Sequence, residues 1–174
     1  FISTGLNDTA KAMIGDAKWY LGGSSTYDDV TSTMFYTRER GTAVYSGHST
    51  NWIGKVGLMY PSDYGYATSG WWFNKRVDCM AVKLYIWDSS NIGSYSSGYS
   101  ECKNNDWLYN SSQYQWTMSP RAGDSTDVFR VSDTGYVGHY NAHNSYAAFP
   151  VVHLKSTIKV ISGSGTTSSP FILG

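Results

Sequence analysis

Short apolar runs separated by turn-forming residues are the feature that most constrains the fold of this 174-residue chain. From residue 41 onward, Gly, Ser, Asn and Asp recur every few positions, and the runs between them are rich in Val, Ile, Tyr and Trp. This pattern is typical of short β-strands. It predicts a hairpin turned at "SDTG" and a strand that starts at Pro150. The strand candidates are residues 55–60, 80–87, 127–131, 135–138 and 149–155.

The first forty residues have a helical pattern instead. Apolar residues recur at helical spacing from Leu6 to Leu21, and the glycine pair that follows supplies a stop. A second helix is expected to start near Ser25 and Thr26, each followed three residues later by an aspartate, in a variant of the capping box. We predict two short helices packed on the β-rich remainder, in one domain spanning residues 1–174.

The composition excludes several classes of protein. Aromatic residues make up 16% of the chain, charged residues make up 15%, and the formal net charge is zero. Such a chain is neither disordered nor a charge-driven nucleic-acid binder, and no stretch is long and apolar enough to span a membrane. The abundance of Tyr, Trp, Ser, Gly and Asn suits an adaptable recognition surface, but it is equally common in extracellular β-rich proteins without a ligand.

The two cysteines, Cys79 and Cys102, lie in polar, Tyr-rich surroundings that suit an oxidising compartment. A disulfide between them would close a loop of about two dozen residues and stabilise the fold by roughly 3 kcal/mol. It would also hold the polar region 88–115, which is unusually long for a structureless loop. The alternative is a pair of free thiols. The spacing, without paired histidines nearby, is a poor zinc signature.

Motifs for catalysis are missing from the sequence. There is no GxSxG, no HExxH and no phosphate-cradling glycine loop, and nothing pairs two carboxylates as a glycosidase requires. We therefore predict a protein that is not an enzyme and needs no cofactor. The weak candidates for a metal site are Asn104, Asn105 and Asp106, whose oxygen atoms suit Ca²⁺, although such clusters are more often turns.

An almost uncharged polar and aromatic segment, "YVGHYNAHNSYAAFP", lies between two strand candidates. Its rings can serve as rigid anchors, and its Asn and Ser side chains can donate and accept hydrogen bonds. Farther upstream, two adjacent tryptophans cannot both face the core of a strand. An ordinary loop is the alternative to a binding face. The predicted ligand-binding residues are His139, Tyr140, Asn141, His143, Asn144, Ser145, Tyr146, Trp71 and Trp72.

Four segments resemble the C-type-lectin-like domain of bacterial surface and pilin-like proteins: "WIGKVGLMYPSDYGYA", "WLYNSSQYQWTMSPR", "VFRVSDTGYVG" and "FPVVHLKSTIKVISGSGTTSSPFIL". The resemblance implies an α+β fold, with two N-terminal helices packed on a twisted antiparallel sheet and long loops that carry specificity. It places Trp107 and Trp116 in the core. The chain departs from the family pattern at Phe149, where an Arg usually precedes the proline, and Phe149 is expected to fill that space.

The same resemblance implies a secreted or surface-displayed binding domain, extracellular or pilus-associated, at the head of an adhesin or pilin-like protein. An anchor, signal peptide or pilin-like stem is expected upstream of Phe1. The expected partner is a protein or glycan ligand, with pilus subunits as further partners. Neither nucleic-acid binding nor membrane insertion by this domain is expected. A structural pilus or surface subunit without a ligand and a calcium-dependent glycan-binding lectin are the alternatives.

Diversification is a further hypothesis for residues 139–149. Related folds include formylglycine-generating enzymes and the variable proteins of diversity-generating retroelements. In the latter, adenine-directed mutagenesis of Asn codons yields mixtures of Asn, Tyr, His, Ser, Asp, Ala and Phe. The segment "HYNAHNSYAAF" uses nearly this alphabet, although an ordinary polar loop also favours Asn, Ser and Tyr.

Overall fold

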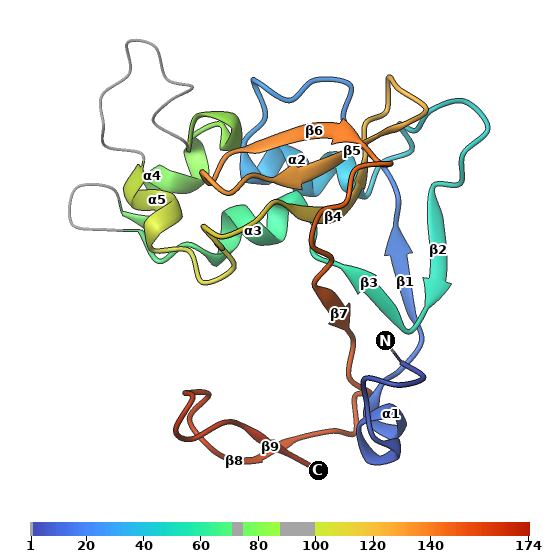
Figure 1. Ribbon diagram of the computed structural model, residues 1–174, viewed down its shortest axis with the longest axis vertical. Coiled ribbons are helices and arrows are strands. Elements are labelled where there is room, and N and C mark those ends of the chain that lie inside the picture. Colours follow the sequence, from blue (N-terminus) through green and yellow to red (C-terminus); the bar gives the residue numbers. More distant parts are fainter. Residues whose placement is uncertain (1, 71–74, 88–99) are drawn as a thin grey trace.

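The computed structural model describes residues 2–70, 75–87 and 100–174. The architecture is mixed α+β, with short helices and several small antiparallel sheets in place of one large sheet (Figure 1). No helix in the described part of the chain has the length and apolar character needed to cross a membrane. The helical elements are α1 (Asp8–Met13), α2 (Ser32–Glu39), α3 (Pro61–Ala67), α4 (Arg76–Ala81), the 3₁₀ helix η1 (Leu84–Trp87) and α5 (Ser100–Asn104).

The strands of the described residues form four small sheets, each antiparallel. The hairpin between β5 and β6 turns at the predicted "SDTG", with Val131 opposite Val137, and β7 begins at Pro150 as predicted. The sheets are β1 (Ala17–Tyr20) with β2 (Asn51–Gly54), β3 (Val56–Leu58) with β7 (Pro150–Val152), β4 (Gln115–Pro120) with β5 (Asp127–Val131) and β6 (Val137–Asn141), and β8 (Val160–Ser162) with β9 (Ile172–Leu173).

The core lies between the three-stranded sheet and helices α2 and α3 (Figure 1). Phe35 of α2 meets Phe129 of β5 edge to face, with 5.1 Å between ring centroids. Tyr64 of α3 is fully buried, and its hydroxyl donates to the carbonyl of Gly135 at 2.8 Å, which ties the helix to the β5–β6 turn. Burial of these large side chains supplies the main stabilisation of this region.

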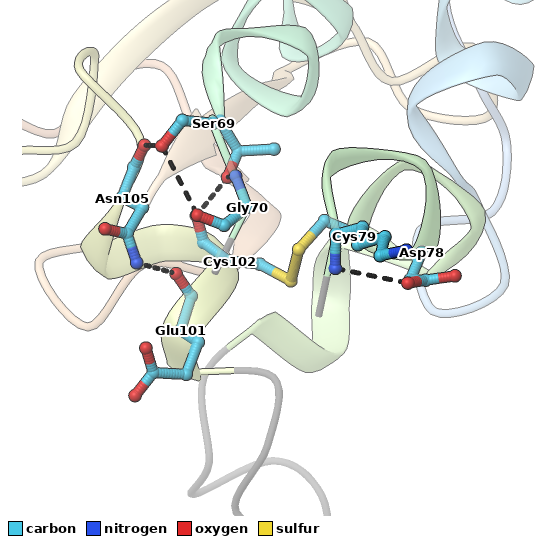
Figure 2. The surroundings of a disulfide bond; sticks show 9 residues. Ser69, Gly70, Asp78, Cys79, Glu101, Cys102 and Asn105 are labelled. Atoms are coloured by element: carbon cyan, nitrogen blue, oxygen red, sulfur yellow. Dashed lines mark hydrogen bonds between the residues drawn. A yellow bond between two sulfur atoms is a disulfide. The ribbon is translucent and has the colours of Figure 1, made fainter. Parts of the chain in front are cut away.

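A disulfide bond joins Cys79 of α4 to Cys102 of α5, with the Cα atoms 5.6 Å apart, as the sequence predicts (Figure 2). Around it, the Thr68 hydroxyl donates to the Cys102 carbonyl at 2.6 Å, and the Ser69 backbone N–H donates to the Asn105 carbonyl at 3.0 Å. These bonds fasten the end of α3 to α5. The disulfide therefore fixes where the chain emerges after α5.

The predicted strand at residues 80–87 is wrong. These residues form the end of α4 and the 3₁₀ helix η1, in which Leu84 and Trp87 are both buried. The run is apolar on more than one side, and periodicity cannot separate a strand from a helix in so short a run. The backbone N–H of Leu84 donates to Val30, which docks this segment against the start of α2.

The N-terminal helix prediction is only partly correct. Helix α1 ends at Met13, and residues 17–20 form β1, in which exposed Lys18 and buried Trp19 alternate as in a strand paired with β2. Helix α1 buries no side chain, so it does not pack on the core as expected. The capping prediction also fails, because α2 begins after Thr31, whose hydroxyl accepts from the Met34 N–H at 3.4 Å.

Candidate functional site

A pocket of about 530 Å³, hereafter the aromatic pocket, lies where β1, β7, α3 and the segment after α5 meet. Its size is in the range of small-molecule sites, and a mainly apolar lining with a few polar groups is typical of them. None of its residues was predicted as a site from the sequence. The lining residues are Lys18, Trp19, Tyr20, Arg40, Met59, Tyr60, Asp63, Tyr66, Ala67, Trp107, Leu108, Val151 and His153.

Trp19 contributes a buried aromatic surface to the pocket. Its indole N–H donates to the Gly54 carbonyl at 3.0 Å, and its ring centroid lies 4.8 Å from that of His153. The backbone of Gly57 runs directly against the indole, and a Cβ atom there would lie 2.5 Å from the ring. Glycine at position 57 thus permits the close approach of β3 to Trp19.

Tyr60 links β1 to the start of α3. Its hydroxyl accepts from the Tyr20 N–H at 2.8 Å and donates to the Tyr20 carbonyl at 3.0 Å, while its backbone N–H donates to the Asp63 carboxylate at 2.9 Å. Burial raises the pKa of the Tyr60 phenol above its usual value of 10.0. The ring is therefore held as a neutral, fixed part of the wall.

Arg40, at the end of α2, brings a cation to the pocket. Its guanidinium stacks 3.5 Å from the Tyr36 ring centroid and lies 5.7 Å from that of Tyr20. Its Nη1 is 3.3 Å from the carboxylate of Glu39, which is fully buried. Arg40 and Glu39 thus form an ion pair at this helix end. Contacts of this kind with ring faces stabilise a cation that is partly removed from water.

Glu39 lies behind Arg40, away from solvent. The Ser62 backbone N–H donates to its Oε1 at 2.9 Å, and the Ser62 hydroxyl donates to its Oε2. Burial nevertheless raises the pKa of Glu39 from 4.5 to about 7, against the lowering effect of these bonds. At neutral pH the carboxyl group therefore neutralises Arg40 only in part.

Trp107 projects from the segment after α5 and is 79% exposed, so the prediction that it belongs to the core is wrong. The turn is fixed by Asp106, whose carboxylate accepts from the Leu108 N–H at 2.8 Å and whose backbone bridges to Thr68. Because Asp106 is buried, the next side chain is directed outward. Trp116 is half-buried, with its ring 4.8 Å from that of Tyr146.

The weak calcium candidates do not point to one centre. Asn104 is exposed, and the Asn105 side chain donates to the Glu101 carbonyl at 2.8 Å (Figure 2). Burial raises the pKa of Asp106 from 3.8 to about 8, which favours the uncharged form at neutral pH. Within the described residues, no group of three or more His, Cys, Asp or Glu is arranged to hold a metal ion.

Arg130 organises the aromatic part of the predicted binding segment. Its guanidinium lies 4.3 Å from the ring centroid of Tyr114, 5.7 Å from that of Tyr140 and 5.6 Å from that of Tyr146. Its Nη2 donates to the Tyr136 hydroxyl at 3.1 Å. We call Arg130 and these four tyrosines the Arg130 cluster. Tyr140 is 47% exposed, so the cluster presents one ring edge to solvent.

The polar members of the predicted segment divide into two groups. His139 faces inward from β6, and its Nδ1 pairs with the Asp127 carboxylate at 2.6 Å. The side chains of Asn141 and Asn144 hold the turn, since Asn141 accepts from the His143 N–H at 3.2 Å and Asn144 donates to the Asn141 carbonyl at 2.9 Å. The side chains of His143 and Ser145 are exposed.

A groove of about 390 Å³ lies beside the end of this segment. Phe149, which the sequence predicted to fill a gap in the core, is 40% exposed and lines the groove. Trp107 and Leu108 line both the groove and the pocket. The groove and the pocket are therefore neighbours that share two wall residues, and we call the two together the hollow. Trp71 and Trp72, also predicted to bind a ligand, lie outside the described residues.

Sequence reasoning missed the pocket because its walls come from five separate stretches of the chain. Residues 18–20 were assigned to a helix, which hid the alternation of Lys18, Trp19 and Tyr20. The available signal was a repeated pairing of aromatic with charged residues, as in "AKWY" and "NDWL".

Comparison with known proteins found no matching family model, no matching curated protein and no matching solved structure.

Proposed function

We propose that this protein is an extracellular ligand-binding domain of the C-type-lectin-like class, the head of an adhesin or pilin-like protein. The observation that carries the proposal is the aromatic pocket, with Trp107 at its rim and a groove leading to residues 139–149. Exposed aromatic rings beside a few charged groups suit contact recognition of a small group on a larger ligand. The Cys79–Cys102 disulfide supports a location in an oxidising compartment.

The arrangement of helices and sheet supports the fold assignment. Helices α2 and α3 contact each other, α3 contacts β4 and β5, and Phe35 and Phe129 join the helices to the sheet. Long connections, such as residues 141–149, lie beyond the sheet and carry the exposed polar side chains. Helices packed on an antiparallel sheet, with exposed side chains in the connections, support the proposed class.

Recognition fits the pocket better than catalysis. One carboxyl group, that of Asp63, lines the pocket, and the nearby Glu39 lies buried behind the wall, where it accepts two bonds from Ser62. Acid–base chemistry on a sugar requires two carboxyl groups that face a common substrate. We therefore propose that the residues of this hollow bind and orient a ligand without transforming it.

The test is a screen of the whole domain against a glycan array and a displayed-peptide library, followed by Trp107→Ala. We expect specific binding that Trp107→Ala weakens at least tenfold, because an exposed ring at the rim of a pocket is a typical hot spot. Trp52→Ala is the matched control, since Trp52 is 46% exposed and lies outside the pocket. Absence of binding to either library would contradict the proposal and favour a structural pilus subunit.

A further inference from the structure

Two cations that line the aromatic pocket lie near the same ring. The Lys18 ammonium is 5.2 Å from the Tyr20 ring centroid, and the Arg40 guanidinium carbon is 5.7 Å from the same centroid. Both residues line the pocket, and both reach it from the ends of regular elements, β1 and α2. Both positive charges therefore lie within reach of one aromatic ring in the wall of the pocket.

These cations retain unused donors. Lys18 has no ion-pair partner among the described residues. Arg40 uses Nη1 for the Tyr36 carbonyl and Glu39, whereas within the described chain Nε and Nη2 make no hydrogen bond. Glu39 offsets the charge of Arg40 incompletely, because burial raises its pKa to about 7. Arg and Lys donors in this setting favour a carboxylate or another compact anion.

Other residues of the pocket offer a flat apolar platform and hydrogen-bond acceptors. Trp107 presents its ring to solvent, and the electron-rich face of an indole attracts the C–H face of a sugar ring. Asp63 and His153 line the same pocket and can bond to hydroxyl groups. The volume of about 530 Å³ admits a small group and not a folded segment of a protein.

We propose that the aromatic pocket binds a carboxylated sugar, such as a uronic or sialic acid unit of a glycan. Its carboxylate lies between Lys18 and Arg40, and its ring lies against Trp107. This inference rests on the proposed function and narrows the ligand to one chemical class. The Tyr60 N–H holds one oxygen of Asp63 at the start of α3, and the other oxygen offers an acceptor to sugar hydroxyls.

The experiment measures binding of two matched pairs to the full chain by calorimetry: trigalacturonate with its methyl ester, and sialyllactose with lactose. At least one acid should bind about tenfold or more tightly than its neutral partner, as expected for hydrogen bonds to a charged group. Lys18→Gln and Arg40→Gln should each weaken binding of that acid by about tenfold and leave the neutral sugar unchanged. Lys159→Gln, an exposed lysine outside the pocket, is the control.

Several results would overturn this inference. The first is equal affinity for an acidic sugar and its neutral partner. The second is no binding of either acidic sugar, and the third is binding of an acidic sugar that Lys18→Gln does not weaken. Lys18 is exposed on β1, so its replacement tests the idea even where Arg40→Gln disturbs the buried Glu39. Binding of neutral sugars or peptides that depends on Trp107 would leave the proposed function standing, whereas no ligand from any class would contradict both.

Discussion

Arg130 and Arg40 each lie among tyrosine rings, but of the two it is Arg40 that lines the aromatic pocket. Arg130 is 7% exposed, and its Nε and Nη1 are buried without a hydrogen-bond partner among the described residues. The Arg40 side chain is 30% exposed, borders the aromatic pocket and has Glu39 behind it. A ring cluster that closes over its cation can only support the fold, whereas one that opens on a pocket leaves donors for a ligand.

Titration of Glu39, the buried carboxyl group behind Arg40, should have the largest effect, because it makes the stability of the protein depend on pH. The pKa of Glu39 is raised from 4.5 to about 7 in the folded protein, so the native state binds more protons than the unfolded state between these values. Its contribution is complete below pH 4.5 and is lost as pH rises through 7. We expect a loss of up to about 3 kcal/mol in the free energy of unfolding.

Urea unfolding at pH 5 and pH 8 measures this loss. Glu39→Gln keeps the shape of the side chain and removes the titration, so the variant should lose less stability than the wild type over the same interval. Asp106 changes stability in the same direction, because burial raises its pKa to about 8; comparing the two proteins isolates the part due to Glu39. Identical pH dependence in both would show that Glu39 does not titrate as described.

Replacing Arg130 should have the next largest effect. Arg130→Ala removes the group that lies between four tyrosine rings, and we expect a loss of about 2 kcal/mol from lost packing. Arg130→Met should recover most of this loss, because an apolar side chain of similar length needs no hydrogen-bond partners. Arg40→Ala should cost under about 1 kcal/mol at pH 6, where Glu39 is mostly neutral.

Chemical denaturation of the three variants tests this difference. A small effect of Arg130→Ala would mean that the rings collapse onto one another without the cation. An effect of Arg40→Ala equal to that of Arg130→Ala would remove the distinction between a closed and an open cluster. Either result would also weaken the case that Arg40 is free to serve a ligand.

The sequence predicted those parts of the molecule that local patterns determine. The β5–β6 hairpin follows from alternation around "SDTG", and the strand start at Pro150 follows from the missing N–H of proline. The predictions of a strand at residues 80–87 and of a helix at residues 17–20 are wrong. Burial of Trp87 and pairing of β1 with β2 depend on distant parts of the chain. Local spacing carries no information about such partners.

In the candidate site, too, local patterns predicted some features, while others depend on distant parts of the chain. The segment 139–149 was recognised by its composition, but composition could not separate side chains that hold the turn from those that face solvent. Tyr146 is packed against the ring of Trp116, and His139 is bonded to Asp127. The sequence does not reveal the pocket because the position of Trp107 depends on the burial of Asp106 and on the disulfide that joins the preceding helix α5 to α4.

The smallest expected effect on stability comes from replacements within residues 139–149. His143 and Ser145 are exposed, and their side chains make no hydrogen bond to the part of the chain that the structure describes. The double replacement His143→Ala with Ser145→Ala should therefore change the free energy of unfolding by less than about 0.5 kcal/mol. Asn141→Ala is the matched control in the same turn. It should cost about 1 kcal/mol, because it removes the acceptor of the His143 N–H and the donor to Thr126.

The same contrast bears on diversification of the segment. If a retroelement varies residues 139–149, positions tolerant of change should carry most of the variation, and deep sequencing of the coding region in its native population measures it. We expect codon changes at exposed Tyr140, His143, Ser145 and Phe149, and few at His139, whose pairing with Asp127 a new side chain would break. Variation spread evenly over the whole chain, or none at all, would mean a fixed binding surface, and the search for ligands would then centre on the aromatic pocket.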